Sequence, residues 1–502
     1  MEQQRKEATE RLLSSQGHDN LFYSEENDGV GVGDGGLVAV SNFTSILGLS
    51  ILTAACITFG FGCAIGYSSP TQSSIMEDLG LSVAEFSLFG SILSIGSLIG
   101  AAISGKITDL FGRKLTMWIL NLFYIGGWLA IAFTKAPWLL NLGRISLGFT
   151  NGISGYLAPI YIAEITTKHV RVRFTTILQV MVGSGASFMY VVGSLVHWRT
   201  LALLATIPGL LQLLLIFFIP ESPRWLANVG REKELEAALL CLRGDKADIS
   251  DEATEIKNHV ESLKSFSRGG IVVDIFQKKY VRPLLTVVGM MVLTNLGGIN
   301  AFVYYSGAIF VSAGISSMVG LITLAATQTV VGILSSTIID KLGRRPLLLV
   351  SSAGLCFSSF LTGVTFFLKD FNWWDQGSPI LAFIGLLMYM GSYALSAGLP
   401  GLLVSEVCKL FSPMLLQLFM FLQLFPINVK GSAGSICNFM GNSTGRVVGY
   451  YFNFLTEWSS AGIFFTFSAF CCANFILIAT MVPETKGRTL EEIQASITPS
   501  SD

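Results

Sequence analysis

Charged residues are scarce in this chain. Asp, Glu, Lys and Arg make up 13% of its 502 residues, whereas an ordinary soluble domain carries roughly a quarter. Hydrophobic residues make up 51%. The composition therefore excludes the class of ordinary soluble globular proteins.

Cysteine motifs and clustered histidines are also lacking. The eight cysteines show no CxxC spacing, so we expect neither a disulfide nor a metal site. The four histidines are scattered, and none accompanies a nucleophile or a second metal ligand. We expect no enzyme activity and no cofactor.

A phosphate-binding loop is incomplete, which argues against an ATP-driven pump. The stretch from Gly100 to Ile107 resembles such a loop, but Ile107 stands where a magnesium-binding hydroxyl is required, and no strand precedes the glycines. The small residues of 96–105 instead favour close helix packing in lipid. A cleavable signal peptide is not expected, because the first 40 residues include no short apolar run with a cleavage site.

Long apolar runs are what the chain does contain, and they are almost free of charge. A helix needs about 20 apolar residues to cross the hydrocarbon core, and it satisfies its own backbone hydrogen bonds there. We predict an all-α polytopic membrane protein with twelve transmembrane helices. The segments are Ile46–Ser68, Ser87–Gly105, Leu115–Thr134, Pro137–Ala163, Phe174–Val196, Thr200–Ile219, Leu284–Tyr305, Ser317–Ile339, Pro346–Leu368, Ile380–Ser405, Gly431–Leu455 and Ser459–Val482.

Positive charge is distributed asymmetrically between the two sides of these segments. Most Lys and Arg residues lie in the tails and in the gaps on the same side, whereas the other side holds Lys135, Arg199 and Lys369. By the positive-inside bias, both termini should face the cytosol. Glu10 to Leu13 resembles a dileucine sorting signal, so we expect the vacuolar or the plasma membrane.

The chain consists of two related halves. The turn Asp109–Lys114 recurs as Asp340–Arg345, and a Pro-Glu pair follows the sixth segment at 220 and the twelfth at 483. Two six-helix pseudo-repeats with a site between them are typical of secondary transporters. The predicted domains are an N-terminal tail (1–44), a first bundle (45–219), a cytosolic helical loop (220–282), a second bundle (283–482) and a C-terminal tail (483–502).

Acidic and basic residues collect at the cytosolic ends of the predicted segments. A tight loop with anchoring cations would explain one such turn, but the two copies favour ion pairs between the bundles that hold an inner gate shut. The candidate gate residues are Asp109, Arg113, Arg144, Glu164, Arg171, Glu221, Arg224, Asp340, Arg344, Arg345, Glu406 and Lys430. The charge of the loop is balanced, so nucleic acid is not an expected partner. No obligate protein partner is inferred.

Several motifs together resemble the sugar porter family of the major facilitator superfamily. They are the doubled Gly-Arg turns, PESPRW at 220–225, PETKG at 483–487, Gly143-Arg144 and the phrase from Gly298 to Tyr305. The stretches 61–70 and 425–431 are similar to its plant early-response-to-dehydration subgroup. The resemblance covers roughly residues 45 to 495. It implies a major facilitator fold and a sugar (monosaccharide) transporter that works by alternating access.

The resemblance also implies which residues face the sugar. An amide offers both a donor and an acceptor to neighbouring ring hydroxyls, although such residues can equally bond neighbouring helices. The implied substrate-binding residues are Gln179, Gln328, Thr294, Asn295, Asn300, Tyr304 and Asn442.

This sequence departs from the family pattern around that site. Thr294-Asn295 replaces a Gln-Gln pair, Gly401 replaces a Trp, and Gly441-Asn442 replaces an Asn-Trp pair. Arg446 stands where the subgroup carries an aromatic residue, although a charge inside a span is costly unless it is paired or hydrated. These departures remove an apolar platform for a sugar ring and leave the identity of the sugar open.

Energy coupling depends on one position of the first segment. Proton-coupled members of the family carry an Asp where this chain has Ala64. The resemblance therefore favours facilitated diffusion. A proton-coupled sugar symporter and a transport-impaired sugar-binding sensor stay open as alternatives.

Residues 408–424 are predicted to be an insertion foreign to the fold. Glu164 precedes Arg171 by 7 residues, whereas Glu406 precedes Lys430 by 24. Removing 408–424 restores the spacing and joins Val407 to Phe425, which begins the subgroup phrase. We expect an alternative splice product or a gene-model error in preference to a functional loop.

Overall fold

The computed structural model describes residues 44–166, 168–244, 248–266, 278–342, 344–371, 377–397 and 427–482. Within these ranges the chain folds as α-helices, without a strand. Both tails, Glu406 and the predicted insertion at 408–424 lie outside the described residues.

The helices of the first half run from residue 45 to residue 216. They are α2 (Ser45–Gly66), α3 (Ser68–Leu79), α4 (Val83–Ala132), α5 (Pro137–Ile165), α6 (Lys168–Gly193), α7 (Trp198–Leu204) and α8 (Ile207–Ile216). Three shorter helices follow, α9 (Pro223–Val229), α10 (Glu232–Arg243) and α11 (Ser250–Phe266). The second half contains α12 (Lys278–Leu296), α13 (Ile299–Ser312), α14 (Ser317–Leu342), α15 (Arg344–Asp370), α16 (Ser378–Ala397), α18 (Ile427–Trp458) and α19 (Ser460–Met481).

The described part of each predicted segment falls on one of these helices or on a consecutive pair, and the tenth segment continues past α16 into residues outside the described ranges. The second and third segments are joined in α4, which bends at Gly112, where φ is +81°. Glycine reaches that backbone conformation at little cost, so it suits the turn between two spans. The seventh segment is broken between α12 and α13, where Gly298 has a φ of +96°. Within the described part of the chain, 7 helical stretches are long and apolar enough, by length and composition, to cross a membrane, and two of them join the consecutive pairs α7–α8 and α12–α13.

Local sequence explains where these helices begin. Ser82 and Glu85 form a capping box at the start of α4, in which each side chain accepts a hydrogen bond from the other's backbone amide. The Thr44 side chain accepts from the amide of Leu47 at the start of α2 and donates to the carbonyl oxygen of Leu242 in α10. The first span is therefore tied to the helices that follow the first half.

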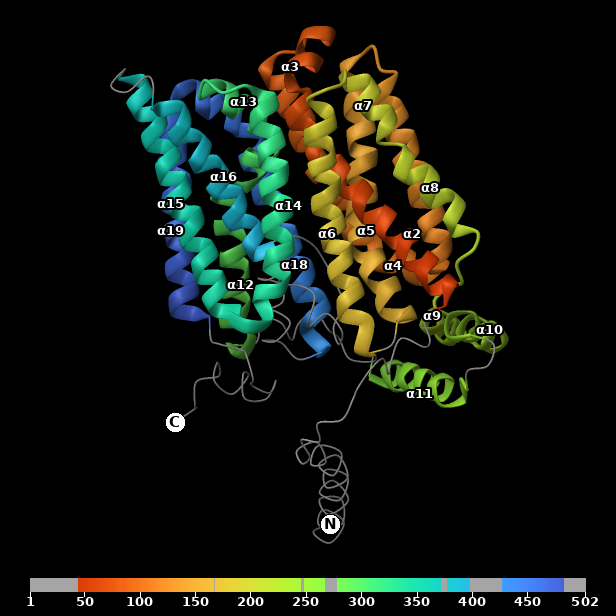
Figure 1. The fold of residues 1–502 in the computed structure, drawn as a ribbon. Coiled ribbons are helices and arrows are strands. Elements are labelled where there is room, and N and C mark those ends of the chain that lie inside the picture. The colour runs from red at the N-terminus through yellow and green to blue at the C-terminus, as the bar shows by residue number, and fades with distance from the viewer. Residues whose placement is uncertain are drawn as a thin grey trace, which may run out of the picture. The chain divides into compact units, whose positions relative to one another are not determined.

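The helices pack as two bundles that follow the two halves of the sequence (Figure 1). In the first half, α2 packs against α5, α6 and α8, and α4 packs against α5; in the second, α15 packs against α16 and α19, and α12 against α18 and α19. One end of the bundles carries α3, α7 and α13 (the α3 end), and the other carries α9, α10 and α11 (the α11 end).

The packing of α4 against α5 depends on glycines, as predicted for 96–105. A Cβ atom built on Gly100 would overlap the carbonyl oxygen of Phe149, and one on Gly148 would overlap the carbonyl oxygen of Leu93. The two backbones are therefore in direct contact. Such close approach is how helices gain packing energy in lipid, where the hydrophobic effect does not drive association.

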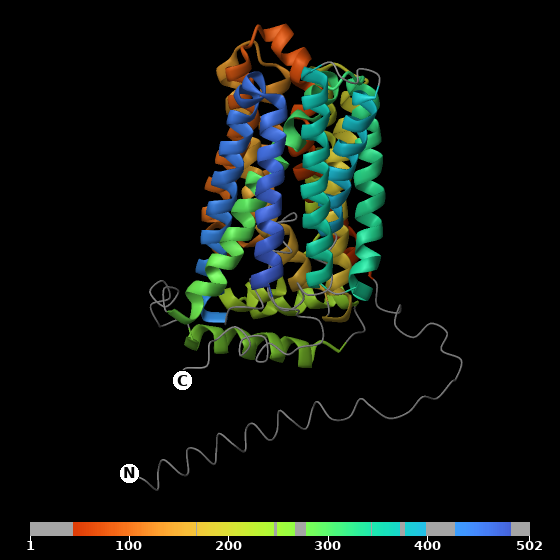
Figure 2. The same ribbon diagram turned by 90° about the vertical axis from the view of Figure 1, so that its left-hand side faces the viewer.

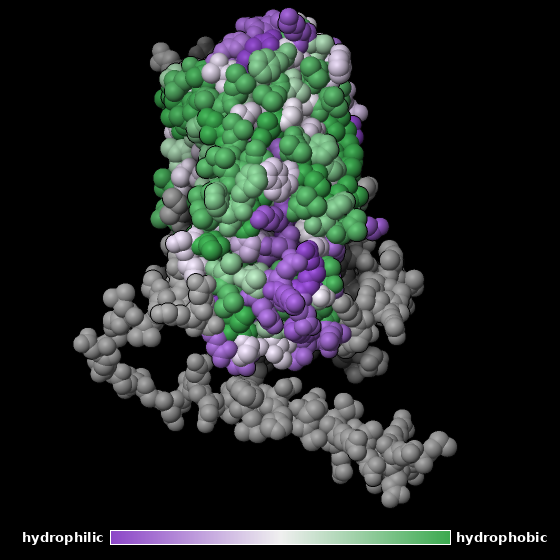
Figure 3. All heavy atoms as spheres, turned by 90° about the vertical axis from the view of Figure 1, so that its right-hand side faces the viewer, coloured by the Kyte–Doolittle hydropathy of each residue, from purple (hydrophilic) through white to green (hydrophobic). Residues whose placement is uncertain are grey.

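The side of the molecule is suited to a membrane. Large apolar side chains such as Leu110, Leu122 and Phe218 are exposed, and Figure 3 shows hydrophobic residues over most of one lateral face, with hydrophilic residues towards the ends. Helices α10 and α11 lie crosswise to the spans at the α11 end (Figure 2). Their apolar residues Leu235, Leu239 and Ala253 pack with Trp225 and Leu226 of α9 in a small core of their own.

Candidate functional site

A buried ion pair lies at the α11 end of the first half. Gly112 turns the chain so that the Arg113 guanidinium reaches Glu164, the penultimate residue of α5. Nε and Nη2 donate to the two carboxylate oxygens, each at 2.9 Å. The two side chains are 8% and 10% exposed. Arg113 also donates from Nη1 to the carbonyl oxygen of Thr108 at 3.1 Å and lies 3.4 Å from Asp109.

A second carboxylate, Glu221, holds the same turn through its backbone. Its oxygens accept from the amides of Arg113 at 2.9 Å, Lys114 at 3.0 Å and Ser222 at 2.8 Å. The Ser222 hydroxyl in turn donates to Glu164 at 2.6 Å. We call Asp109, Arg113, Glu164, Glu221 and Ser222 the Arg113 cluster.

Burial acts on the titratable groups of the Arg113 cluster. It raises the pKa of the Glu221 carboxyl, and the backbone amides that donate to Glu221 only partly oppose it. For Arg113, burial lowers the pKa, but the charge and hydrogen bonds of Glu164 outweigh it, so the pKa lies above its usual value. Glu164 thus stabilises the charged form of Arg113.

These ion pairs differ from the prediction in one respect. We expected pairs between the bundles, but Arg113, Glu164 and Glu221 all belong to the first half. The reason is geometric: the turn after the second span, the end of the fourth span and the segment after the sixth meet at one end of the same bundle.

The remaining candidate gate residues are described less completely. The side chains of Arg171, Asp340, Arg344 and Lys430 are not described, and Glu406 is outside the described residues. Arg224 is half-buried at the start of α9. Arg345 donates from Nη2 to the carbonyl oxygen of Ala479 in α19 at 2.8 Å.

Arg144 lies apart from the Arg113 cluster, near the α3 end of α5. It is fully buried, and its Nη1 donates to the carbonyl oxygen of Ala64 at 2.7 Å while Nη2 donates to the Ser68 hydroxyl. The guanidinium carbon lies 4.7 Å from the centre of the Phe89 ring. Arg144 therefore fastens α5 to the break between α2 and α3, a role different from pairing with an acid at a gate.

Hydrogen bonds join the two halves towards the α3 end. The Gly307 amide of α13 donates to the Ser69 hydroxyl at 2.9 Å, and Tyr190 of α6 donates to the carbonyl oxygen of Val303 at 3.0 Å. Asn453 of α18 donates to Ser87 of α4 at 2.9 Å. These residues hold the two halves together at that end.

The predicted substrate residues of the seventh segment lie around the break between α12 and α13. Asn300 donates to Asn295 at 2.8 Å, and Asn295 donates to the carbonyl oxygen of Met291 at 2.8 Å. Gly445 of α18 packs directly against both amides. Thr294 is buried and accepts from Asn474 of α19 at 3.2 Å, so its hydroxyl is engaged between helices.

Gln328 of α14 lies against α6 of the opposite half. Its Nε2 lies 4.0 Å from the position a Cβ would take on Gly183 of α6. Gln179 lies one turn before Gly183 on α6, although its side chain is not described. Tyr304 is buried with its ring against Gly449, and Asn442 is half-buried on α18.

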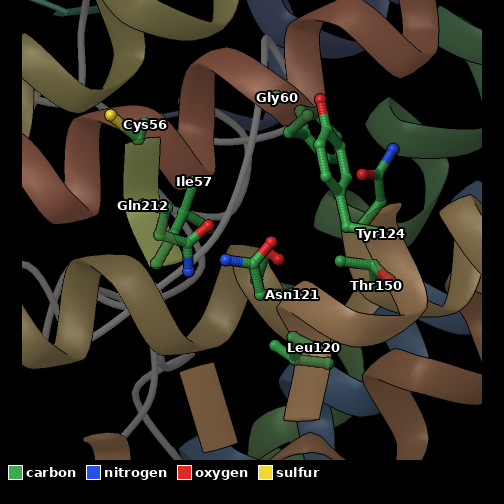
Figure 4. A pocket seen from close by; sticks show the side chains of 11 residues that line it. Cys56, Ile57, Gly60, Leu120, Asn121, Tyr124, Thr150 and Gln212 are labelled. Carbon is green, nitrogen blue, oxygen red and sulfur yellow. The ribbon is translucent and has the colours of Figure 1, made fainter. Parts of the chain in front are cut away.

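A small pocket lies inside the first bundle rather than between the halves. Figure 4 shows Asn121 and Gln212 facing it, with Cys56 and Thr150 nearby. Asn121 donates to the carbonyl oxygen of Gly209 at 2.8 Å, but its side-chain oxygen and the amide nitrogen of Asn151 have no hydrogen-bond partner among the described residues. Such a pocket suits an ordered water and is too small for a sugar ring.

Sequence reasoning missed the residues that join the halves near the α3 end. Ser69, Ser87 and Tyr190 stand in ordinary apolar stretches, and no local pattern marks them. Ser222 could have been found, because it begins α9 and accepts from the Trp225 amide at 3.3 Å, as an N-terminal helix cap does.

The comparisons with known proteins agree with this architecture. A family model described as "Sugar (and other) transporter" matches residues 37–496. Sugar transporter ERD6-like 15 of Arabidopsis thaliana is 45% identical over 457 residues, which cover 90% of this chain and 92% of that protein. The chain belongs to the sugar transporter family. Sugar transporter ESL1 of the same plant is 44% identical over 458 residues, which cover 91% of this chain and 93% of that protein.

Solved structures confirm the fold of this member of the sugar transporter family. The inward-open xylose transporter XylE from E. coli superposes with a TM-score of 0.72 at 21% identity, covering 90% of this chain and 99% of XylE. A partially occluded structure of XylE superposes with a TM-score of 0.69. The predicted twelve-helix major facilitator fold and the similarity to the plant subgroup are thus confirmed, and the family is one of membrane transporters, not enzymes.

Proposed function

We propose that this chain carries a monosaccharide across a membrane by alternating access and facilitated diffusion. The observation that carries the proposal is the position of Gln328, whose amide lies beside Gly183 of α6 where the two halves meet. Gln179, Asn300 and Gln328 would provide the hydrogen bonds to the sugar. Asn295 positions Asn300 by accepting its hydrogen bond. Thr294 accepts a hydrogen bond from Asn474 and so stabilises the helices around the site without contacting the sugar.

The two ends of the bundles have different parts in the cycle. Ser69, Ser87 and Tyr190 close the α3 end through hydrogen bonds to the second half. We assign the α11 end, with both termini, to the cytosol, in keeping with the positive-inside bias. The family and the exposed apolar side chains support an integral membrane protein, and the vacuolar and plasma membranes are the proposed locations.

The Arg113 cluster makes the cytosolic end of the first half a rigid body. It ties the bend of α4, the end of α5 and the start of α9 together. In the proposed inner gate, this rigid end meets the related residues of the second half, Asp340, Arg344, Glu406 and Lys430. Rocking of one bundle against the other then opens and closes the path.

Facilitated diffusion is supported by the surroundings of Ala64. Ala64 carries no titratable group, and its carbonyl oxygen is occupied by Arg144 at 2.7 Å. Away from their ends, the described spans contain no carboxylate that could bind and release a proton during transport.

Uptake by purified protein in liposomes tests the proposal. A panel of radiolabelled monosaccharides is offered with and without an inward proton gradient, and protein-free liposomes are the control. We expect the internal concentration of a transported sugar to reach the external level and stop there. Accumulation above it under the gradient would instead establish the symporter, and saturable binding without uptake would establish the sensor.

A further inference from the structure

Arg446 lies within the described part of α18 and is exposed, with no hydrogen bond or ion pair to another described residue. A guanidinium keeps its charge in proteins, and a charge that faces hydrocarbon costs several kcal/mol. Arg446 must therefore face water or a polar partner.

The register of α18 shows which way Arg446 faces. The buried face of the helix, with Gly445, Val448 and Phe452, packs in the second half. Asn453 lies two turns after Arg446 on the same face, and it donates to Ser87 of α4 in the first half at 2.9 Å. Arg446 thus lies on the side of α18 that faces the first half, on the α11 side of that contact.

The neighbours of Arg446 belong to the proposed sugar site. Gly445, the preceding residue, packs against the amides of Asn300 and Asn295. Asn442 lies one turn earlier on the face that Arg446 shares. Arg446 follows Gly445 directly, so its long side chain extends from the turn of α18 that contacts Asn300.

The middle of the described spans is electrostatically one-sided. The carboxylates of the described helices lie at span ends, for example Glu85 and Glu457 at the α3 end and Glu164 at the α11 end. The interior holds Arg144, which is enclosed by Ala64 and Ser68, and Arg446. Among the described residues, the middle of the spans thus carries positive charge without a counter-charge, which a neutral sugar would leave uncompensated.

We propose that Arg446 binds the anionic group of an acidic monosaccharide, either the carboxylate of a hexuronate or the phosphate of a hexose phosphate. This rests on the proposed sugar transport and names its substrate class. The planar guanidinium binds a carboxylate or a phosphate through two parallel hydrogen bonds, while Asn300 and Gln328 bind the ring hydroxyls.

Transport into liposomes tests this substrate class directly. Radiolabelled glucose, glucuronate and glucose 6-phosphate are compared for the unaltered chain, Arg446→Gln and Arg446→Lys. We expect kcat/KM for one of the two acids to exceed that for glucose by about tenfold or more, because charge-assisted hydrogen bonds contribute roughly 1.5–3 kcal/mol. Arg446→Gln should remove that preference by lowering kcat/KM for the acid about tenfold more than kcat/KM for glucose, and Arg446→Lys should keep part of the preference, since lysine cannot form two parallel hydrogen bonds.

Two controls separate the charge of Arg446 from other effects. Arg231→Gln removes a positive charge from an exposed pair with Glu234, beyond the spans, and should change nothing. A potential set with potassium and valinomycin, positive inside, should accelerate uptake of the acid and leave glucose unaffected. Size-exclusion chromatography in detergent confirms that each variant is folded.

Each outcome decides the proposal. If glucose is transported and neither acid is preferred, the inference fails while the proposed sugar transport stands. If Arg446→Gln lowers the uptake of all three compounds equally, Arg446 has a structural role and the inference is wrong. If no sugar, neutral or acidic, is transported, the proposed function and this inference fail together.

Discussion

Arg113 and Glu164 form a buried ion pair with two hydrogen bonds at the proposed gate. Both guanidinium contacts are 2.9 Å long, and both side chains are nearly buried. Breaking such a pair by removing one charge is costly because the other charge stays buried without a partner. Ser222 adds a further hydrogen bond to the same carboxylate.

We expect Glu164→Gln to lower the stability of the first half by about 3 kcal/mol, because Arg113 loses a buried counter-charge. The melting temperature in detergent should fall clearly, and uptake at equal protein amounts should fall with it. The matched control is Glu234→Gln, which breaks the exposed pair with Arg231 and should leave the melting temperature almost unchanged. Equal melting temperatures for both variants would contradict the structural role of Glu164.

We expect Gln328→Ala, and likewise Gln179→Ala, to cut sugar uptake about tenfold without changing the amount of protein in the membrane. A sugar hydroxyl left without its partner costs roughly 1–3 kcal/mol. The control on the same helix is Thr323→Ala, whose hydroxyl donates only to the carbonyl oxygen of Val319. Unchanged affinity and rate in a Gln variant would remove that residue from the site.

Residue roles were only partly predictable. Arg113, Glu164 and Glu221 were found because the turn and the Pro-Glu phrase repeat in the sequence. The sequence did not predict that these three residues belong to one bundle. A repeat indicates which residues are related, but not which residues are in contact. Arg144 was grouped with the gate by its motif, whereas its contacts to Ala64 and Ser68 place it elsewhere.

At the scale of elements, the contact between α4 and α5 is made by backbone as much as by side chains. A Cβ on Gly148 would overlap the carbonyl oxygen of Leu93, and one on Gly152 would overlap that of Ser97. In lipid this close packing supplies stability that apolar burial cannot.

We therefore expect Gly148→Val to force α4 and α5 apart, lowering the melting temperature and the yield of folded protein. Gly126→Val is the matched control in α4, because no atom lies within 4 Å of a Cβ built there. Thermal denaturation in detergent compares the two variants. Equal stability would mean that the two helices do not approach as closely as described.

Helix existence was easier to predict than helix breaks. The long apolar runs predicted the spans because length and hydropathy are local properties of the chain. The break at Gly298, with a φ of +96°, stands inside an apolar run, whereas the one between α2 and α3 falls at the end of the first predicted segment. Nothing in the run around Gly298 distinguishes a break from a continuous helix, so that break appeared only in the structure.

At the scale of the whole molecule, the internal repeat makes a prediction about residues 408–424. These residues lie outside the described part of the chain, and their removal would return Glu406 and Lys430 to the spacing of 7 that Glu164 and Arg171 have. We expect the shortened chain to transport more than the full one at matched expression. If it is no more active and no more stable, the segment belongs to the functional protein.

The sequence by itself determined the class, the twelve spans, the two halves and the family, because composition, hydropathy and repeated motifs are properties of the linear chain. Only the tertiary structure decided that Arg113 pairs within its own half, that Ser87 meets Asn453, and that Arg446 is exposed on α18. These facts join residues from distant parts of the chain. Their partners depend on where each backbone lies in space, which the packing of α4, α5 and α18 sets.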